Sequence, residues 1–449
     1  MEKNLYHTSI TALGCLCLIV SMALAFPNLS AGMPGFDVSK MSDMSDFNPN
    51  KPLVPTGDTI KIGLIEAFSG PGALAGDAYS ISSGWVAHDI NKRGGIIVDG
   101  KKKKIQIING DDQSKPAETK KIAEKLCLED KVNILAGVTG THLTLVVQNV
   151  AKQYKIPFMS YAGYSDELMD GRNFNRYTFR VRQNTTMLGA IGYYYAQRPE
   201  KKFYILCQDY AFGHAWADAV KKSLKQYKPE AKIVGEEYHP LFLKDFAPYL
   251  TKFQASGAEV ILTANWGPDI MNLIKQARQM GITQGIAGYE PDPAVLSGAV
   301  TGKEAIGLVV CNDHSLAIDT PGNTALVKMY CDIQPKWGGN YANRLWKYPF
   351  GAVGATISMF YWLFDVMERA GSTNSEKIIA TWEGDEYRAM NGVVKMRACD
   401  HQVLRDIFVT EMIYPSKWYG GEAGYGKVFV IPAQYCTPPV PEDLDRCKK

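Results

Sequence analysis

The chain has 449 residues, enough for two or three domains. Hydrophobic residues make up 46% and charged residues 21%, as in ordinary globular proteins, so disorder along the whole chain is excluded. The 49 Lys+Arg against 46 Asp+Glu leave a formal net charge of +3, which argues against a nucleic-acid partner. The only long uncharged apolar run lies at the N-terminus, which excludes a polytopic membrane protein.

That N-terminal run predicts export. It covers residues 10–26, and Ala23-Leu24-Ala25 within it matches the small-x-small cleavage pattern. We interpret residues 1–25 as a secretory signal peptide, so the mature chain is expected to begin near Phe26. The alternative is an uncleaved membrane anchor, for which the run is slightly short.

The next segment, residues 26–57, is rich in Pro, Ser, Met, Asp and Asn. No helix or strand period is visible in it, so the sequence predicts a flexible leader that precedes the folded part of the chain.

The cysteines are consistent with an exported protein. Of the nine cysteines, Cys15 and Cys17 lie in the signal peptide, and the odd number that remains implies at least one free or intermolecular thiol. Cys127 and Cys207 lie in apolar stretches typical of buried free thiols. The disulfides that we predict are Cys311–Cys331 and Cys436–Cys447; because sequence does not fix connectivity, other pairings stay open.

From residue 60 onward, short apolar stretches alternate with longer amphipathic ones. Strands are predicted over 60–65, 105–108, 132–136, 156–159, 203–207, 233–236, 260–263 and 285–288. Helices are predicted over 72–91, 115–128, 142–154, 212–227, 246–255 and 268–280. Such alternation is typical of parallel sheets covered by helices on both faces, and its two blocks predict two doubly wound α/β domains.

The last third of the chain departs from this alternation. A long apolar helix is predicted over 348–370, strands over 393–396 and 404–411, and an irregular tail over 436–449. These elements are too few to form a core alone, so we expect them to pack on the earlier sheets.

Enzyme motifs are missing or incomplete. The chain has no G-x-S-x-G and no H-E-x-x-H motif, and its seven histidines show no ligand spacing. Residues 70–76 miss the dinucleotide-binding spacing by one residue, and residues 298–304 miss the phosphate-loop pattern. The sequence therefore predicts no catalytic residue, no metal site and no cofactor.

Several motifs occur together in a characteristic order. They are Ile60-Lys61-Ile62-Gly63, Ser69-Gly70-Pro71, Ile90-Asn91-Lys92-Arg93-Gly94-Gly95-Ile96, Asp111-Asp112-Gln113-Ser114-Lys115-Pro116, Asp209-Tyr210-Ala211-Phe212-Gly213, Asp245-Phe246, Gln276-Ala277-Arg278-Gln279-Met280-Gly281 and Arg397-Ala398-Cys399-Asp400-His401-Gln402. With them, the chain from Thr59 to Tyr435 resembles the periplasmic substrate-binding proteins of ABC transporters. The branch that it resembles binds branched-chain amino acids, amides and aromatic compounds (type I, leucine/isoleucine/valine-binding-like).

The resemblance implies a Venus-flytrap fold, in which two α/β lobes are joined by three hinge strands and the ligand lies between them. The first lobe would comprise 58–182 and 312–392. The second would comprise 183–311 and 393–435, which leaves 436–449 as a C-terminal tail.

The resemblance also implies a binding site. Its ligand-binding residues would be Ser69, Thr139, Gly140, Thr141, Ala162, Gly163, Tyr164, Tyr210, Phe212, Trp266 and Glu290. The loop 139–141, just before a helix, would hold a ligand carboxylate; the alternative is that Thr141 only caps the helix. Glu290 would pair with a ligand ammonium group, the alternative being a surface carboxylate.

Two positions depart from the pattern of the amino-acid binders. Tyr164 stands where those relatives have a small hydroxyl residue, and it would donate a hydrogen bond or stack on a ring. Ala75 is smaller than the aromatic residue of some relatives, which suggests a roomier cavity or one filled by Phe68. Trp266 would face the cleft or, alternatively, be a structural residue at a strand end.

The function that the resemblance implies is capture of an amino acid or close analogue in the periplasm and its delivery to an ABC permease, by a monomer and without catalysis. An aromatic acid or an amide is the alternative ligand. A sensor that feeds a signalling receptor and an enzyme on the same fold are the alternative functions.

Overall fold

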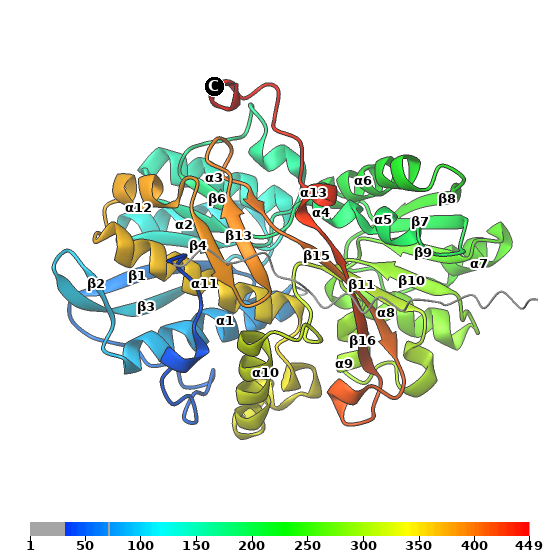
Figure 1. Ribbon diagram of the computed structural model, residues 1–449, viewed down its shortest axis with the longest axis horizontal. Helices are drawn as coiled ribbons and strands as arrows, with labels where there is room; N and C mark the ends of the chain where they lie inside the picture. The colour runs from blue at the N-terminus through cyan, green and yellow to red at the C-terminus, as the bar shows by residue number, and fades with distance from the viewer. Residues whose placement is uncertain (1–31, 71, 449) are drawn as a thin grey trace, which may run out of the picture. The chain divides into compact units, whose positions relative to one another are not determined.

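The first of two large sheets is built from the N-terminal half of the chain (Figure 1). The computed structural model describes residues 32–70 and 72–448, so the predicted signal peptide lies outside the described residues. Six strands pair in the order β2 (Ile96–Val98), β3 (Lys101–Asp111), β1 (Thr59–Glu66), β4 (Ile134–Gly137), β5 (Phe158–Ser160) and β6 (Thr178–Arg180). Only β2 and β3 pair antiparallel, across a turn at Asp99 and Gly100 where φ is 51° and 73°.

Two helix pairs accompany this sheet. They are formed by α1 (Ala73–Lys92) with α11 (Gly351–Ala370), and by α2 (Pro116–Leu128) with α3 (Thr141–Tyr154). Helix α11 is buried along most of its length, which explains the long apolar run in its sequence. Among the described residues, no helix is long and apolar enough to cross a membrane.

The second large sheet has seven strands, in the order β16 (Gly424–Ile431), β15 (Ile407–Ile413), β11 (Leu308–Asn312), β10 (Gly285–Gly288), β9 (Val260–Thr263), β7 (Lys202–Gln208) and β8 (Lys232–His239). β15 and β16 run antiparallel to their neighbours and the rest are parallel. The connecting helices are α4 (Thr185–Gly189), α5 (Ile191–Tyr195), α6 (Ala211–Tyr227), α7 (Ala247–Ser256), α8 (Gly267–Gln279) and α9 (Asp292–Leu296). Two mainly parallel sheets with helices confirm the predicted α/β class.

A small third sheet differs from the predicted lobe division. It contains β12 (Glu386–Ala389), β13 (Gly392–Met396) and β14 (Val403–Leu404), preceded by α10 (Pro321–Ile333) and α12 (Ser375–Trp382). The sequence analysis placed residues from 393 onward in the second lobe. Instead β13 pairs with β12, whose Tyr387 ring stacks on Trp362 of α11, and the chain joins the seven-stranded sheet only at β15.

We call the six- and three-stranded sheets with their helices the first lobe, and the seven-stranded sheet with its helices the second lobe. The chain passes between the lobes after β6, after β11 and after β14. One residue from each of these crossings, Arg182, Asp313 and Arg405, belongs to a single buried charge cluster. Asp313 accepts hydrogen bonds from Arg182 at 2.6 Å and from Arg405 at 3.2 Å. Burial alone would raise the pKa of Asp313, but the two guanidinium groups hold it below its ordinary value.

The segment before β1 packs on the first lobe, unlike the flexible leader that its composition predicts. Its Met44 and Phe47 side chains are only 1% and 4% exposed, and the Phe47 ring lies 5.3 Å from Trp85 and 5.6 Å from Trp337. The Ser42 N–H donates to Asp89 at 2.6 Å. Buried apolar side chains and polar contacts together hold this segment on the first lobe; the Phe36 ring, for example, lies 4.9 Å from Tyr361, and Asp46 pairs with Lys92 at 2.8 Å.

Both predicted disulfides are wrong. Cys399 bonds to Cys447, with Cα atoms 4.9 Å apart, and Cys311, Cys331 and Cys436 are free thiols. Cys311 is fully buried on β11 of the second lobe, whereas Cys331 is half-buried on α10. The buried free state predicted for Cys127 and Cys207 is confirmed.

Candidate functional site

A pocket lies where strands of both lobes end. In the first lobe, its lining residues follow β1, β4 and β5; in the second lobe, they follow β7, β9 and β10. In each lobe these strands run parallel, so their carboxyl ends meet at one edge of the sheet, where doubly wound folds bind ligands. The topology therefore brings together loops that are far apart in sequence.

One side of the pocket is the N-terminus of α3. Gly140 occupies the N-cap position with φ 111°, and no side chain caps the helix. Thr141 is thus the first helical residue rather than the cap, and its hydroxyl accepts the Ser165 N–H at 3.3 Å. Among the described residues, nothing accepts a hydrogen bond from the N–H groups of residues 141–143. Such N–H groups and the positive end of the helix dipole favour an anion.

The backbone before this helix is already paired. The Gly140 N–H donates to the Ala162 carbonyl at 3.1 Å, and the Thr139 N–H donates to the buried Glu66 carboxyl group at 3.3 Å. The Thr139 hydroxyl is buried without a protein partner among the described residues. That hydroxyl is therefore available to a ligand at the pocket wall.

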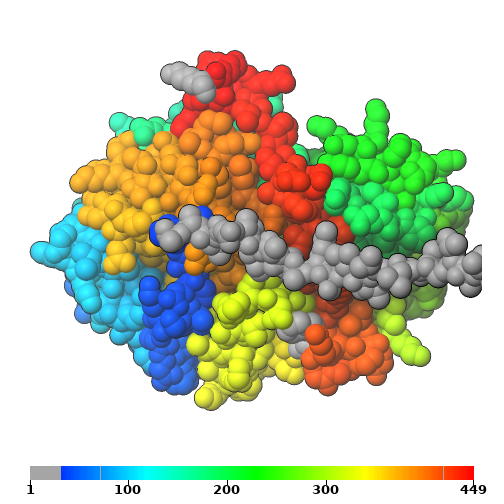
Figure 2. Space-filling view, viewed as in Figure 1, coloured from blue at the N-terminus to red at the C-terminus, as the bar shows by residue number. Residues whose placement is uncertain are grey.

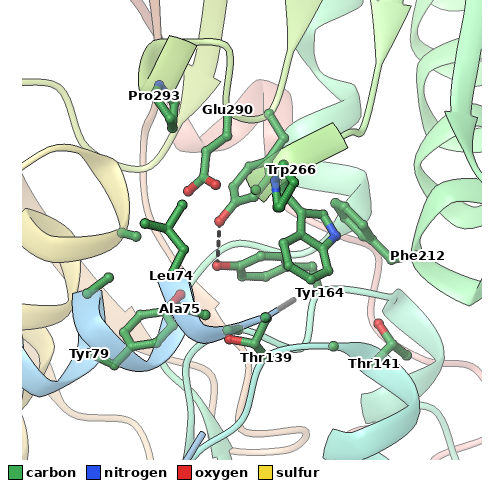
Figure 3. A pocket seen from close by; sticks show the side chains of 18 of the residues that line it. Leu74, Ala75, Tyr79, Thr139, Thr141, Tyr164, Phe212, Trp266, Glu290 and Pro293 are labelled. Atoms are coloured by element: carbon green, nitrogen blue, oxygen red, sulfur yellow. Dashed lines mark hydrogen bonds between the residues drawn. The ribbon is translucent and has the colours of Figure 1, made fainter. Parts of the chain in front are cut away.

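The other side of the pocket carries Glu290, which is 8% exposed (Figure 3). Its carboxyl group points into the pocket, and Oε1 has no partner among the described residues. Burial raises the pKa of Glu290 to about 8; Asp292 adds to the rise, and Arg182 and the Tyr289 hydroxyl oppose it. In the free protein at neutral pH this side chain is therefore mostly a protonated acid.

Aromatic side chains form the walls between these two sides. The hydroxyl groups of Tyr164 and Tyr289 share a hydrogen bond of 2.8 Å that joins the lobes, drawn as a dashed line in Figure 3. The Phe212 ring lies 5.6 Å from Tyr164, and the Trp266 indole N–H donates to the Tyr210 hydroxyl at 2.8 Å. Tilted and edge-on rings of this kind favour a flat or apolar ligand body.

The pocket is narrow as it stands. Its cavity volume is about 50 Å³. One water needs about 10–15 Å³ of such volume, so the pocket accommodates a few waters. A larger ligand requires the lining side chains or the lobes to move apart.

The structure brings together most of the residues that the sequence analysis selected. The pocket is lined by Thr139, Gly140, Thr141, Ala162, Tyr164, Tyr210, Phe212, Trp266 and Glu290. Their roles in ligand binding stay predictions. Glu290 is buried, and not the surface carboxylate of the alternative interpretation.

Two selected residues do not line the pocket. The Ser69 hydroxyl donates to Asp111 at 2.6 Å on an exposed turn, and Pro71 of the same turn lies outside the described residues. Gly163 faces the first-lobe core, where an added Cβ atom would lie 2.2 Å from the Thr144 hydroxyl oxygen. Both residues belong to loops next to the pocket, but neither residue lines it.

Other lining residues escaped the sequence analysis as site residues. They are Gly72, Leu74, Ala78, Tyr79, Gly267, Pro268, Tyr289, Pro293, Phe350 and Ala352, whereas Ala75, which was expected at the cavity, does line it. Tyr79 follows Ala75 by one helical turn, so helix periodicity could have found it. Phe68, suggested as a residue that fills the cavity, does not line it. Phe350 and Ala352 reach the pocket because α11 packs on α1. This contact is between distant parts of the chain, so no pattern in the neighbouring sequence predicts it.

The chain belongs to the periplasmic binding protein family, whose model matches residues 59–417. Among curated proteins, Leu/Ile/Val-binding protein homolog 6 of Brucella melitensis is 23% identical over 361 residues, which cover 79% of this chain and 88% of that protein. Both the first sheet and β15 of the second lie within the matched range.

Solved structures share the fold. The leucine-, isoleucine-, valine-, threonine- and alanine-binding protein of Brucella ovis, in a closed conformation, superposes with a TM-score of 0.73 at 21% identity, over 86% of this chain and 98% of that one. A solute-binding protein of an ABC transporter from R. palustris, in complex with 4-hydroxybenzoate, gives a TM-score of 0.70 at 22% identity, over 83% and 97% of the two chains.

Proposed function

We propose that this protein binds a small organic acid between its lobes in the periplasm and delivers it to the permease of an ABC transporter, without making or breaking a bond. The observation that carries the proposal is one pocket with an uncapped helix N-terminus on one side and, on the other, a buried carboxyl group whose Oε1 has no partner among the described residues. Membership of the periplasmic binding protein family supports the transport role and the location.

The α3 N-terminus would hold the carboxylate of the ligand. The N–H groups of residues 141–143 supply donors that need no side chain, and the Thr139 hydroxyl adds another. Because the backbone donors remain, Thr141→Ala should weaken binding by only about 0.5–1.5 kcal/mol.

Glu290 favours an amino acid or close analogue. A ligand ammonium group would satisfy the unpartnered oxygen, and its charge would ionise the side chain by lowering the raised pKa. Removing the negative charge in Glu290→Gln should weaken such a ligand by about 2–4 kcal/mol, or about 30- to 1000-fold.

The pocket walls support a second candidate, an aromatic acid. Seven aromatic side chains line the pocket: Tyr79, Tyr164, Tyr210, Phe212, Trp266, Tyr289 and Phe350. A protonated Glu290 can donate to a phenol or carbonyl oxygen, a role that Gln keeps. The complex of an R. palustris relative with 4-hydroxybenzoate is consistent with such a ligand.

A thermal-shift screen over amino acids, amides and aromatic acids, followed by calorimetry on Glu290→Gln, tests the proposal. Loss of affinity in Glu290→Gln identifies an amino acid; unchanged or tighter binding identifies an aromatic acid or amide. Glu118→Gln on the surface of α2 is the matched control and should bind as the wild type does. If no small acid stabilises the protein, the proposed function is wrong.

A further inference from the structure

The C-terminal segment, residues 437–448, lies beyond the family match and runs from one lobe to the other. It begins after α13 (Ala433–Cys436), which packs on α4 of the second lobe. Figure 2 shows this segment in red, between the orange atoms of the three-stranded sheet and the green atoms of the second lobe.

The start of the segment is fixed to the second lobe. The Tyr435 ring stacks on Tyr193 of α5 with centroids 4.7 Å apart and planes inclined by 18°. Cys436 is buried, and its thiol approaches the carbonyl oxygen of Arg405 at the third crossing. The segment therefore leaves the second lobe directly beside the crossings.

Its remainder is fixed to the first lobe. Arg397, which follows β13, donates to the Pro438 carbonyl at 2.8 Å. Arg446 donates to Glu383 at 2.6 Å and to the Ala398 carbonyl at 2.7 Å. The Cys399–Cys447 disulfide then closes the end of the chain onto the same turn.

We infer that this segment is a covalently locked strap, a fourth connection that limits how far the lobes open. The disulfide joins residues 48 positions apart, and the loop that it closes leaves the first lobe at the third crossing, forms β15 and β16, and returns through the strap. Only Thr437 separates the last buried residue on the second lobe from Pro438, whose carbonyl is held by the first. Separation of the lobes on this side therefore stretches or breaks the attachment.

The covalent bond matters because packing under the middle of the strap is sparse, although Leu444 near its end is buried. A cavity of about 450 Å³ lies between residues 438–443 and the first lobe, lined also by Asp166, Arg180 and Asp400. Pro439 and Val440 are exposed. The half-buried disulfide, the arginine contacts and the buried Leu444 hold the strap in place, and a reductant has access to the disulfide.

The inference rests on the proposed function in one respect, that the lobes open to admit a ligand. Small-angle scattering of the ligand-free mature chain tests it without knowledge of that ligand. The variants are C399S together with C447S, which unlock the strap, and a four-residue Gly-Ser insertion after Thr437, which lengthens it but keeps the disulfide. We expect a larger radius of gyration in both, and in the wild type after reduction. C331S, which removes a free partly buried thiol, should leave the radius unchanged.

The strap inference is wrong if the radius of gyration is unchanged in the insertion variant. It is also wrong if the radius is unchanged in both the double Ser variant and the reduced wild type. In either case the disulfide only stabilises the first lobe internally. A lower melting temperature alone does not support the strap inference, because loss of a disulfide that only stabilises the first lobe would also lower it. Should the double Ser variant fail to fold, reduction of the folded wild type replaces it. A failure of the ligand screen does not change these radii, so the two hypotheses fail separately.

Discussion

The hydroxyl oxygens of Tyr164 and Tyr289 lie 2.8 Å apart, so one hydrogen bond joins the two lobes inside the pocket. Tyr164 follows β5 of the first lobe and Tyr289 follows β10 of the second. Burial raises the pKa of Tyr164 to about 12 and that of Tyr289 well above its ordinary value, so both hydroxyls stay neutral at physiological pH and one donates to the other. A ligand that separates these hydroxyl groups must replace the bond between them.

We expect Tyr289→Phe to loosen the ligand-free protein. The substitution keeps the ring and removes the hydroxyl. Because one hydrogen bond is lost, the free energy of unfolding should fall by about 0.5–1.5 kcal/mol. Chemical denaturation measures this loss, and scattering should show a larger radius. Tyr79→Phe is the control, because it removes a hydroxyl from the pocket without breaking a bond between the lobes. Equal effects in the two variants would contradict a role in joining the lobes.

The stability of the free protein should depend on pH through Glu290. An unfolded glutamate loses its proton near 4.5, whereas folded Glu290 keeps it to about 8. Between these values the folded state binds more protons, so the contribution of Glu290 to stability falls as pH rises, by up to about 1.4 kcal/mol per pH unit, and is constant above about pH 8.

The difference between wild type and Glu290→Gln in denaturant unfolding, measured from pH 5 to pH 9, isolates this contribution from those of other acidic groups. Glu118→Gln again serves as control. The variant should gain stability relative to the wild type as pH rises. A difference that does not vary with pH would show that Glu290 is ionised in the free protein.

Asp313→Asn should be among the most destabilising substitutions in the chain. It leaves the buried Arg182 and Arg405 without their carboxylate, which costs about 3–5 kcal/mol. The exposed ion pair of Arg344 and Glu422 is the comparison, since Glu422→Gln should cost no more than about 1 kcal/mol. Urea unfolding of both variants measures and compares the two losses in the free energy of unfolding.

Phe47→Ala tests whether the segment before β1 belongs to the folded unit. Loss of a buried ring packed against Trp85 costs about 3–5 kcal/mol, whereas Leu53→Ala at a half-exposed site should cost less than about 0.5 kcal/mol. Similar melting temperatures for Phe47→Ala and the wild type would mean that the segment detaches in solution.

Local patterns predicted most regular elements of the large sheets. Apolar strands such as β9 and β10 and amphipathic helices such as α3 and α6 appear within a few residues of the predicted bounds. The dipeptide Asp99-Gly100 is typical of a hairpin turn, because few residue types adopt positive φ twice in succession, as these two do. These features depend on neighbouring residues alone.

Features that depend on distant contacts were missed. The strand β6 has only three residues, which is too short to show the alternation of apolar and polar residues that marks a strand. The strand β16 lies at the sheet edge and mixes polar residues with apolar ones. Cys399 and Cys447 meet only because the tail returns to the first lobe. In the pocket, Tyr289 was overlooked beside the selected Glu290, since its importance lies in reaching Tyr164 from the other lobe.

The charge cluster at the crossings has a mechanical consequence. Arg182, Asp313 and Arg405 come from three separate segments but share one carboxylate. Bending one segment by itself would leave a buried charge without its partner, which costs free energy. We therefore expect the three segments to turn together about one axis, so that the lobes would swing about it in preference to sliding past each other.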